Sequence, residues 1–65
     1  MNIQTALKKG QLILRNNNIQ SAQLDSEILM SEAIKKDKKF IILNSDEEIK
    51  KRKLYYFDFL INERA

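Results

Sequence analysis

The sequence contains no cysteine, no histidine and no proline, and Gly10 is its only glycine. Without cysteine and histidine, the chain can form no disulfide, no thiolate nucleophile and no zinc site of the Cys/His kind. Loops that hold phosphates or nucleotides depend on glycine, because it lets the backbone approach the ligand closely. The usual glycine-rich pocket for a nucleotide-derived cofactor is therefore excluded.

Long apolar runs are also missing, since the longest is the four residues Phe40-Ile41-Ile42-Leu43. A membrane helix needs about 20 apolar residues, and a signal peptide needs an apolar stretch of roughly 7–15. We therefore expect no membrane segment. Together with the absence of disulfides, this predicts a cytoplasmic protein.

The nine carboxylates have no histidine beside which to act. Asp25 and Glu27 are two residues apart, so they cannot share one face of a helix as an acid/base pair. The serines have neither a histidine base nor a lysine at a suggestive spacing. We expect no catalytic residue, no cofactor-binding residue and no metal ligand in the chain.

Positive charge is concentrated in two short clusters, at residues 35–39 and 50–53, and the net charge is +3. A surface that binds nucleic acid is one interpretation of such clusters. A solvated surface is the interpretation that we favour, because charge runs commonly have no partner.

The apolar residues recur at helical spacing along the whole chain. A first helix is predicted over residues 3–16, ended by the asparagines at 16–18, which tolerate the left-handed conformation of helix ends. Gly10 lies on its apolar stripe at a cost of about 1 kcal/mol relative to alanine. We therefore expect a neighbouring helix to approach closely at Gly10.

Two further helices follow. The second begins after Ser21, whose hydroxyl is expected to accept a backbone N–H, and ends near residues 35–36. Its apolar side chains occupy more than one face, so we expect it at the centre of the bundle. The third covers residues 38–43 and is capped by Asp37.

Ser45 and Glu48 have the spacing of a capping box, which predicts a last helix from residue 46 to the end of the chain. Its main apolar face includes Tyr56 and also carries Arg64. The predicted fold is an all-α bundle of four helices, or five if one splits, forming a single helical domain over residues 1–65.

Tyr55 and Phe59 lie on another side of the last helix, beside Arg52. Aromatic residues and arginine are enriched where proteins bind each other. These three residues are therefore candidate partner-binding residues. The alternative is that both rings pack in the core, which in so small a bundle is slightly favoured.

Asp25 follows the start of the second helix, where a carboxylate is favourable. A cation on an apolar face needs a partner, so we predict an ion pair between Asp25 and Arg64. The alternative role for Asp25 is helix capping alone.

The order of these motifs resembles a known family. Its marks are Ile19-Gln20-Ser21, then Leu24-Asp25-Ser26-Glu27-Ile28-Leu29-Met30, a short helix at residues 40–43 and a long helix that closes in Arg64. The heptapeptide resembles the signature Leu/Arg-Asp-Ala-Glu-Leu-Leu-Leu in the N-terminal domain of the bacterial release-factor glutamine methyltransferases, the HemK/PrmC family. The positions matched by that family are Ser21, Leu24, Asp25, Glu27 and Arg64. Ala22 departs from it, because proline often stands there.

The resemblance implies a parent enzyme in which a second, Rossmann-like domain binds S-adenosylmethionine. That enzyme methylates the glutamine of the Gly-Gly-Gln loop in class 1 peptide chain release factors. The helical domain would help to bind the protein substrate and contact the catalytic domain, and this chain would be a domain cut at its C-terminal boundary. Two alternatives remain: a free-standing basic module that binds nucleic acid, and an adaptor between proteins.

Overall fold

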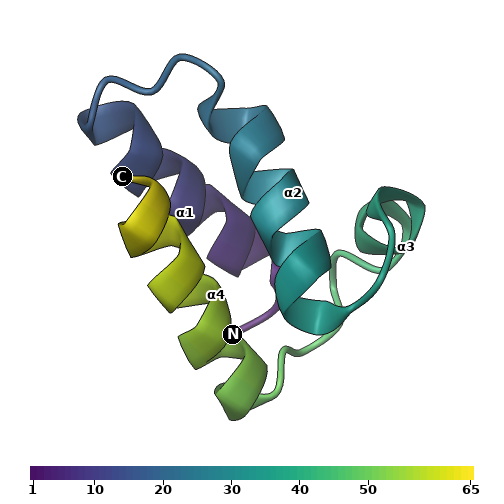
Figure 1. Ribbon diagram of the computed structural model, residues 1–65. Coiled ribbons are helices and arrows are strands. Elements are labelled where there is room, and N and C mark those ends of the chain that lie inside the picture. The colour runs from purple at the N-terminus through teal and green to yellow at the C-terminus, as the bar shows by residue number, and fades with distance from the viewer.

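The computed structural model describes all 65 residues, which form four α-helices and no strand. They are α1 (Ile3–Asn16), α2 (Ala22–Ile34), α3 (Lys38–Leu43) and α4 (Lys51–Arg64). Helices α1, α2 and α4 pack side by side, and the short α3 lies beyond the far side of α2 (Figure 1). The predicted all-α bundle of four helices is confirmed. None of the helices is long and apolar enough to cross a membrane.

The core is formed by all four helices. Helix α2 contacts each of the other three, which confirms the expectation that it lies at the centre. The largest fully buried apolar side chains come from every helix: Leu14, Met30, Ile41, Phe57 and Ile61. Burial of these side chains stabilises the fold by about 25 cal/mol for each Å² of apolar surface removed from water.

Gly10 allows α1 and α4 to approach closely. A Cβ atom at this position would lie 2.9 Å from Ile61 Cδ1 and 2.9 Å from Phe57 Cζ. Both distances are shorter than normal carbon contacts, so any larger residue would have to displace buried side chains. The close approach that the sequence predicts is confirmed.

The ends of α1 and α3 are set by local chemistry. Asn18 has a left-handed φ of 64° after α1, and Asp37 Oδ1 accepts the Phe40 N–H at 2.9 Å before α3. The predicted bounds of both helices are confirmed. Ser21 is different, because it makes no side-chain bond to the backbone of α2. Its hydroxyl donates instead to Asp25 Oδ2 at 2.9 Å, so Ser21 is the N-cap residue as predicted, but the predicted hydroxyl bond to a backbone N–H is wrong.

Helix α4 begins at Lys51, five residues later than the predicted start. The segment before it runs beside the first residues of α1, where the Ile3 N–H donates to the Glu47 carbonyl and the Gln4 N–H to the Ser45 carbonyl, both at 2.9 Å. The first N–H groups of a helix have no partner within it. Residues 45–49 supply those partners to α1, and the predicted capping box of α4 is wrong.

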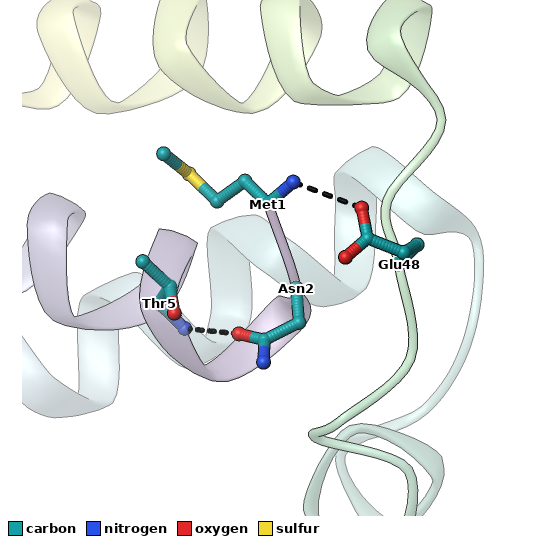
Figure 2. A network of polar contacts seen from close by, with 4 residues as sticks. All are labelled: Met1, Asn2, Thr5 and Glu48. Carbon is teal, nitrogen blue, oxygen red and sulfur yellow. Dashed lines mark hydrogen bonds and ion pairs between the residues drawn. The ribbon is translucent and has the colours of Figure 1, made fainter.

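Figure 2 shows how the side chains complete this arrangement. The Met1 amino group pairs with the Glu48 carboxylate at 2.9 Å, and Asn2 Oδ1 accepts the Thr5 N–H at 2.8 Å. Asn2 and Glu48 also form an isolated antiparallel bridge. Glu48 therefore binds the start of the chain rather than the start of α4.

Candidate functional site

Asp25 fastens the start of α2 to the end of α4. Its Oδ2 atom lies 3.0 Å from Arg64 Nη2 and also accepts the Ser21 hydroxyl. The Asp25 side chain is 17% exposed and the Arg64 side chain 50%. The predicted Asp25–Arg64 ion pair is confirmed. The role of Asp25 is therefore not limited to capping the start of α2. Because Arg64 is half exposed, the pair is only partly desolvated, and its contribution is smaller than that of a buried pair.

Glu27 fastens α2 to a different neighbour. Its Oε1 atom lies 3.2 Å from Lys38 Nζ, at the first residue of α3, and the Glu27 side chain is 15% exposed. Residues two apart on a helix point in different directions. Asp25 can therefore pair with a residue of α4 while Glu27 pairs with a residue of α3. This contact was not predicted from the sequence, because Lys38 belongs to the basic cluster at residues 35–39.

These contacts give both signature carboxylates a structural role. Nowhere do three or more aspartates or glutamates lie close enough together to hold a metal ion. Leu24, between Ser21 and Asp25, is 50% exposed, and Ile28 in the next turn is 56% exposed. The signature carboxylates therefore connect α2 to α3 and α4, and two aliphatic side chains of the signature remain at the surface.

The outward side of α4 forms the second candidate region. We call it the α4 ridge; its residues, all of them exposed, are Arg52, Tyr55, Tyr56, Phe59 and Glu63. Tyr55 is 61% exposed and Phe59 56%, so the alternative that both rings pack in the core is wrong. Tyr56, expected on the apolar face, is 40% exposed and stacks on Phe59 with the ring centroids 6.5 Å apart.

Buried side chains of α4 explain this placement. Phe57 and Ile61 fill the inner side of the helix against Gly10, so the aromatic residues next to them in the sequence face outwards. Tyr56 and Glu63 were not predicted from the sequence to lie on this surface. Their spacing from Arg52 and Phe59 is the signal that would have found them.

Several lysines of the basic clusters contact other residues of the chain. Lys35 Nζ lies 3.3 Å from Glu32 Oε1, and Lys36 Nζ lies 5.2 Å from the centre of the Phe40 ring. Lys51 lies over the ring of Tyr55 in the same way. These contacts support the interpretation of the clusters as a mixed, solvated surface.

Comparison with known proteins decides the family. The family model described as the PrmC N-terminal domain matches residues 5–65, which include Asp25 and Glu27 and their cationic partners. The chain belongs to the PrmC N-terminal domain family. The helical bundle, the Asp25–Arg64 pair and the Glu27–Lys38 pair are thus features of a PrmC N-terminal domain.

One curated relative of this PrmC N-terminal domain is a release factor glutamine methyltransferase from Clostridium acetobutylicum. The two sequences are 39% identical over 61 residues, which cover 92% of this chain and 21% of the relative. The chain therefore spans about a fifth of the length of the curated relative it matches. No solved structure matches the chain.

Proposed function

We propose that this PrmC N-terminal domain is the non-catalytic, substrate-recruiting part of a protein-(glutamine-N5) methyltransferase. The parent enzyme acts in the cytoplasm on the Gly-Gly-Gln glutamine of class 1 peptide chain release factors. Its catalytic domain binds S-adenosylmethionine, which supplies the methyl group, and these 65 residues bind no cofactor. The observation that carries the proposal is the family match over residues 5–65, together with the name of the Clostridium relative.

The composition and the structure support a recruiting role over a catalytic one. The single glycine of the chain, Gly10, is enclosed by Phe57 and Ile61, so it offers no backbone to a cofactor. Asp25 and Glu27 are held by Arg64 and Lys38. The domain therefore offers other molecules an exposed surface rather than a catalytic site. Contacts of a protein substrate with this surface, away from the reacting group, can lower the concentration of substrate that an enzyme needs.

Arg52, Tyr55 and Phe59 are the proposed contact residues for the release factor or for the catalytic domain. They are exposed, and the rings are rigid and apolar. Residues of these types dominate the energetics of many protein interfaces.

Calorimetric titration of the isolated chain tests the proposal. We expect saturable binding of a class 1 release factor, with a dissociation constant on the order of 10⁻⁴ M or tighter, and no saturable heat with S-adenosylmethionine. Replacing Tyr55 and Phe59 together by alanine should weaken release-factor binding by at least about tenfold, because central aromatic contacts carry much of the energy.

Leu12→Ala is the matched control for the double variant, since Leu12 is also 56% exposed but belongs to α1. It should bind normally, and all variants should melt close to the unmodified chain. Saturable binding of S-adenosylmethionine would overturn the assignment as a non-catalytic domain. Preference for nucleic acid over release factor, with affinity that falls steeply with salt, would favour the basic-module alternative instead.

A further inference from the structure

The α4 ridge has the spacing of a helix that packs against another helix. Arg52, Tyr56, Phe59 and Glu63 follow one another at steps of four, three and four residues, and all four are exposed. This is the spacing at which side chains face a partner in a coiled coil. Phe57 and Ile61 already occupy the inner face of α4. The ridge is therefore a second seam on the outside of the molecule, where α4 lies uncovered (Figure 1).

The two ends of this seam carry opposite charges. Arg52 stands in the first turn of α4 and Glu63 in the last turn. Neither residue takes part in any of the four ion pairs of the chain. Between the two charges lie the stacked rings of Tyr56 and Phe59. Such a stripe complements an identical stripe that runs in the opposite direction.

We propose that two copies of this chain associate through their α4 ridges in antiparallel orientation. In this register Arg52 faces the partner's Glu63, and Tyr56 faces the partner's Phe59. A two-fold axis between the helices repeats each contact, as expected of an interface made by one surface on both subunits. A parallel arrangement would instead bring Arg52 against the partner's Arg52, which electrostatic repulsion disfavours.

The size of the ridge limits the strength of this association. The ends of the ridge are eleven residues apart along α4, a span of about 16 Å, and only three rings, each 40–61% exposed, lie between them. The contact falls well below the roughly 800 Å² per partner of a stable interface. The expected dissociation constant is therefore on the order of 10⁻⁴ M.

Reversal of the two end charges tests both the occupant and the orientation. The Arg52→Glu variant has two acidic ends and the Glu63→Arg variant has two basic ends. Each variant alone should self-associate at least about tenfold more weakly than the unmodified chain, because like charges then face each other twice. An equimolar mixture of the two should associate as well as the unmodified chain, since every facing pair is again of opposite sign. Sedimentation equilibrium up to about 2 mM measures the unmodified chain, the two variants and their mixture.

Both substitutions should leave the fold intact. A glutamate near the start of a helix and an arginine near its end are each favoured by the helix dipole, and melting curves verify this. The matched controls are Lys9→Glu and Glu47→Arg, which change the net charge by the same two units at exposed positions off the ridge. Both controls should self-associate like the unmodified chain.

Three results would overturn the inference. They are a chain that stays monomeric at about 2 mM, charge-reversed variants that self-associate normally, and a mixture that fails to recover association. The test uses the chain alone, so its failure would leave the proposed role in a methyltransferase untouched. Because the release factor is proposed to bind the same ridge, the weak dimer should dissociate when the release factor binds, and the two proposals do not exclude each other.

Discussion

Ser26 lies in the middle of the signature and is fully buried, yet its hydroxyl has no hydrogen-bond partner. Burying an unpaired hydroxyl costs about 1–3 kcal/mol. The signature that this segment resembles has alanine at this position, which would fill almost the same space without that cost. The unpaired Ser26 hydroxyl thus lowers the stability that burial of α2 provides.

Replacing Ser26 by alanine should stabilise the domain by about 1 kcal/mol, because the unpaired hydroxyl is removed and little volume is lost. For a chain of this size that corresponds to a rise in melting temperature of roughly 4–8 °C. Thermal unfolding followed by circular dichroism measures the change. Ser31→Ala is the control on the same helix, since the Ser31 hydroxyl donates to the Lys36 carbonyl, and it should destabilise. Equal destabilisation by both substitutions would contradict this account of Ser26.

For single residues, features that depend on neighbours in the sequence could be predicted. Asp37 caps α3 and Asn18 ends the turn after α1 because each acts within three or four residues. Ser21 could not be predicted in the same way. Its hydroxyl donates to the Asp25 carboxylate that also holds Arg64. The Ser21 hydroxyl can bond either a backbone N–H of the first turn or the Asp25 carboxylate four residues on, and the sequence does not decide between these two local partners.

Two ion pairs connect the helices around α2. Asp25 reaches Arg64 of α4, and Glu27 reaches Lys38 of α3. In both pairs the carboxylate is mostly buried and the cation about half exposed. The energetic contribution of such pairs lies between that of surface pairs, about 0–1 kcal/mol, and that of buried pairs.

A double-mutant cycle on Asp25→Ala and Arg64→Ala should give a coupling energy of about 0.5–1 kcal/mol, discounted for the exposure of Arg64. The coupling should fall when salt is added, because salt screens exposed charges. Urea unfolding of the four proteins provides the measurement. A cycle on Glu32 and Lys35, whose side chains are 56% and 66% exposed, is the control and should show coupling close to zero. If the Asp25–Arg64 coupling is no larger than this control, the pair does not hold α4 to α2.

The start of α4 shows where prediction at the element scale fails. Ser45 and Glu48 have the spacing of a capping box, yet the Ser45 carbonyl accepts from Gln4, and Glu48 binds the Met1 amino group. The polar groups of Ser45 and Glu48 could bind at the start of α4 or at the start of α1. Which of the two they bind depends on the position of α1 in the folded molecule. The central position of α2 could be predicted, because its apolar residues occupy several faces of the helix. Burying all of them requires neighbouring helices on more than one side.

For the whole molecule, the class of fold and the family could be predicted from the sequence, whereas the surface could not. The helical period of the apolar residues, with no strand-like run to pair, is enough for an all-α bundle. Whether Tyr55 and Phe59 were core or surface depended on Phe57 and Ile61 filling the space beside Gly10. Only the packed structure shows which side chains of α4 are buried in the core. The candidate partner surface consists of those that are left exposed.

The proposed division of labour predicts how an intact enzyme responds to this domain. In the Clostridium relative, deleting the segment that matches this chain should raise the Michaelis constant for release factor, because remote binding contacts are lost. The turnover number should change little, because the chemistry belongs to the other domain. Inserting this chain in place of the deleted segment should restore the Michaelis constant, since 39% of the aligned residues are identical.

Steady-state kinetics of these three enzymes test the central claim most directly. The account predicts a Michaelis constant for release factor that rises at least about tenfold on deletion, a turnover number within about threefold of the intact enzyme, and recovery in the chimaera. An unchanged Michaelis constant after deletion, or a loss confined to the turnover number, would contradict a substrate-recruiting role for this domain.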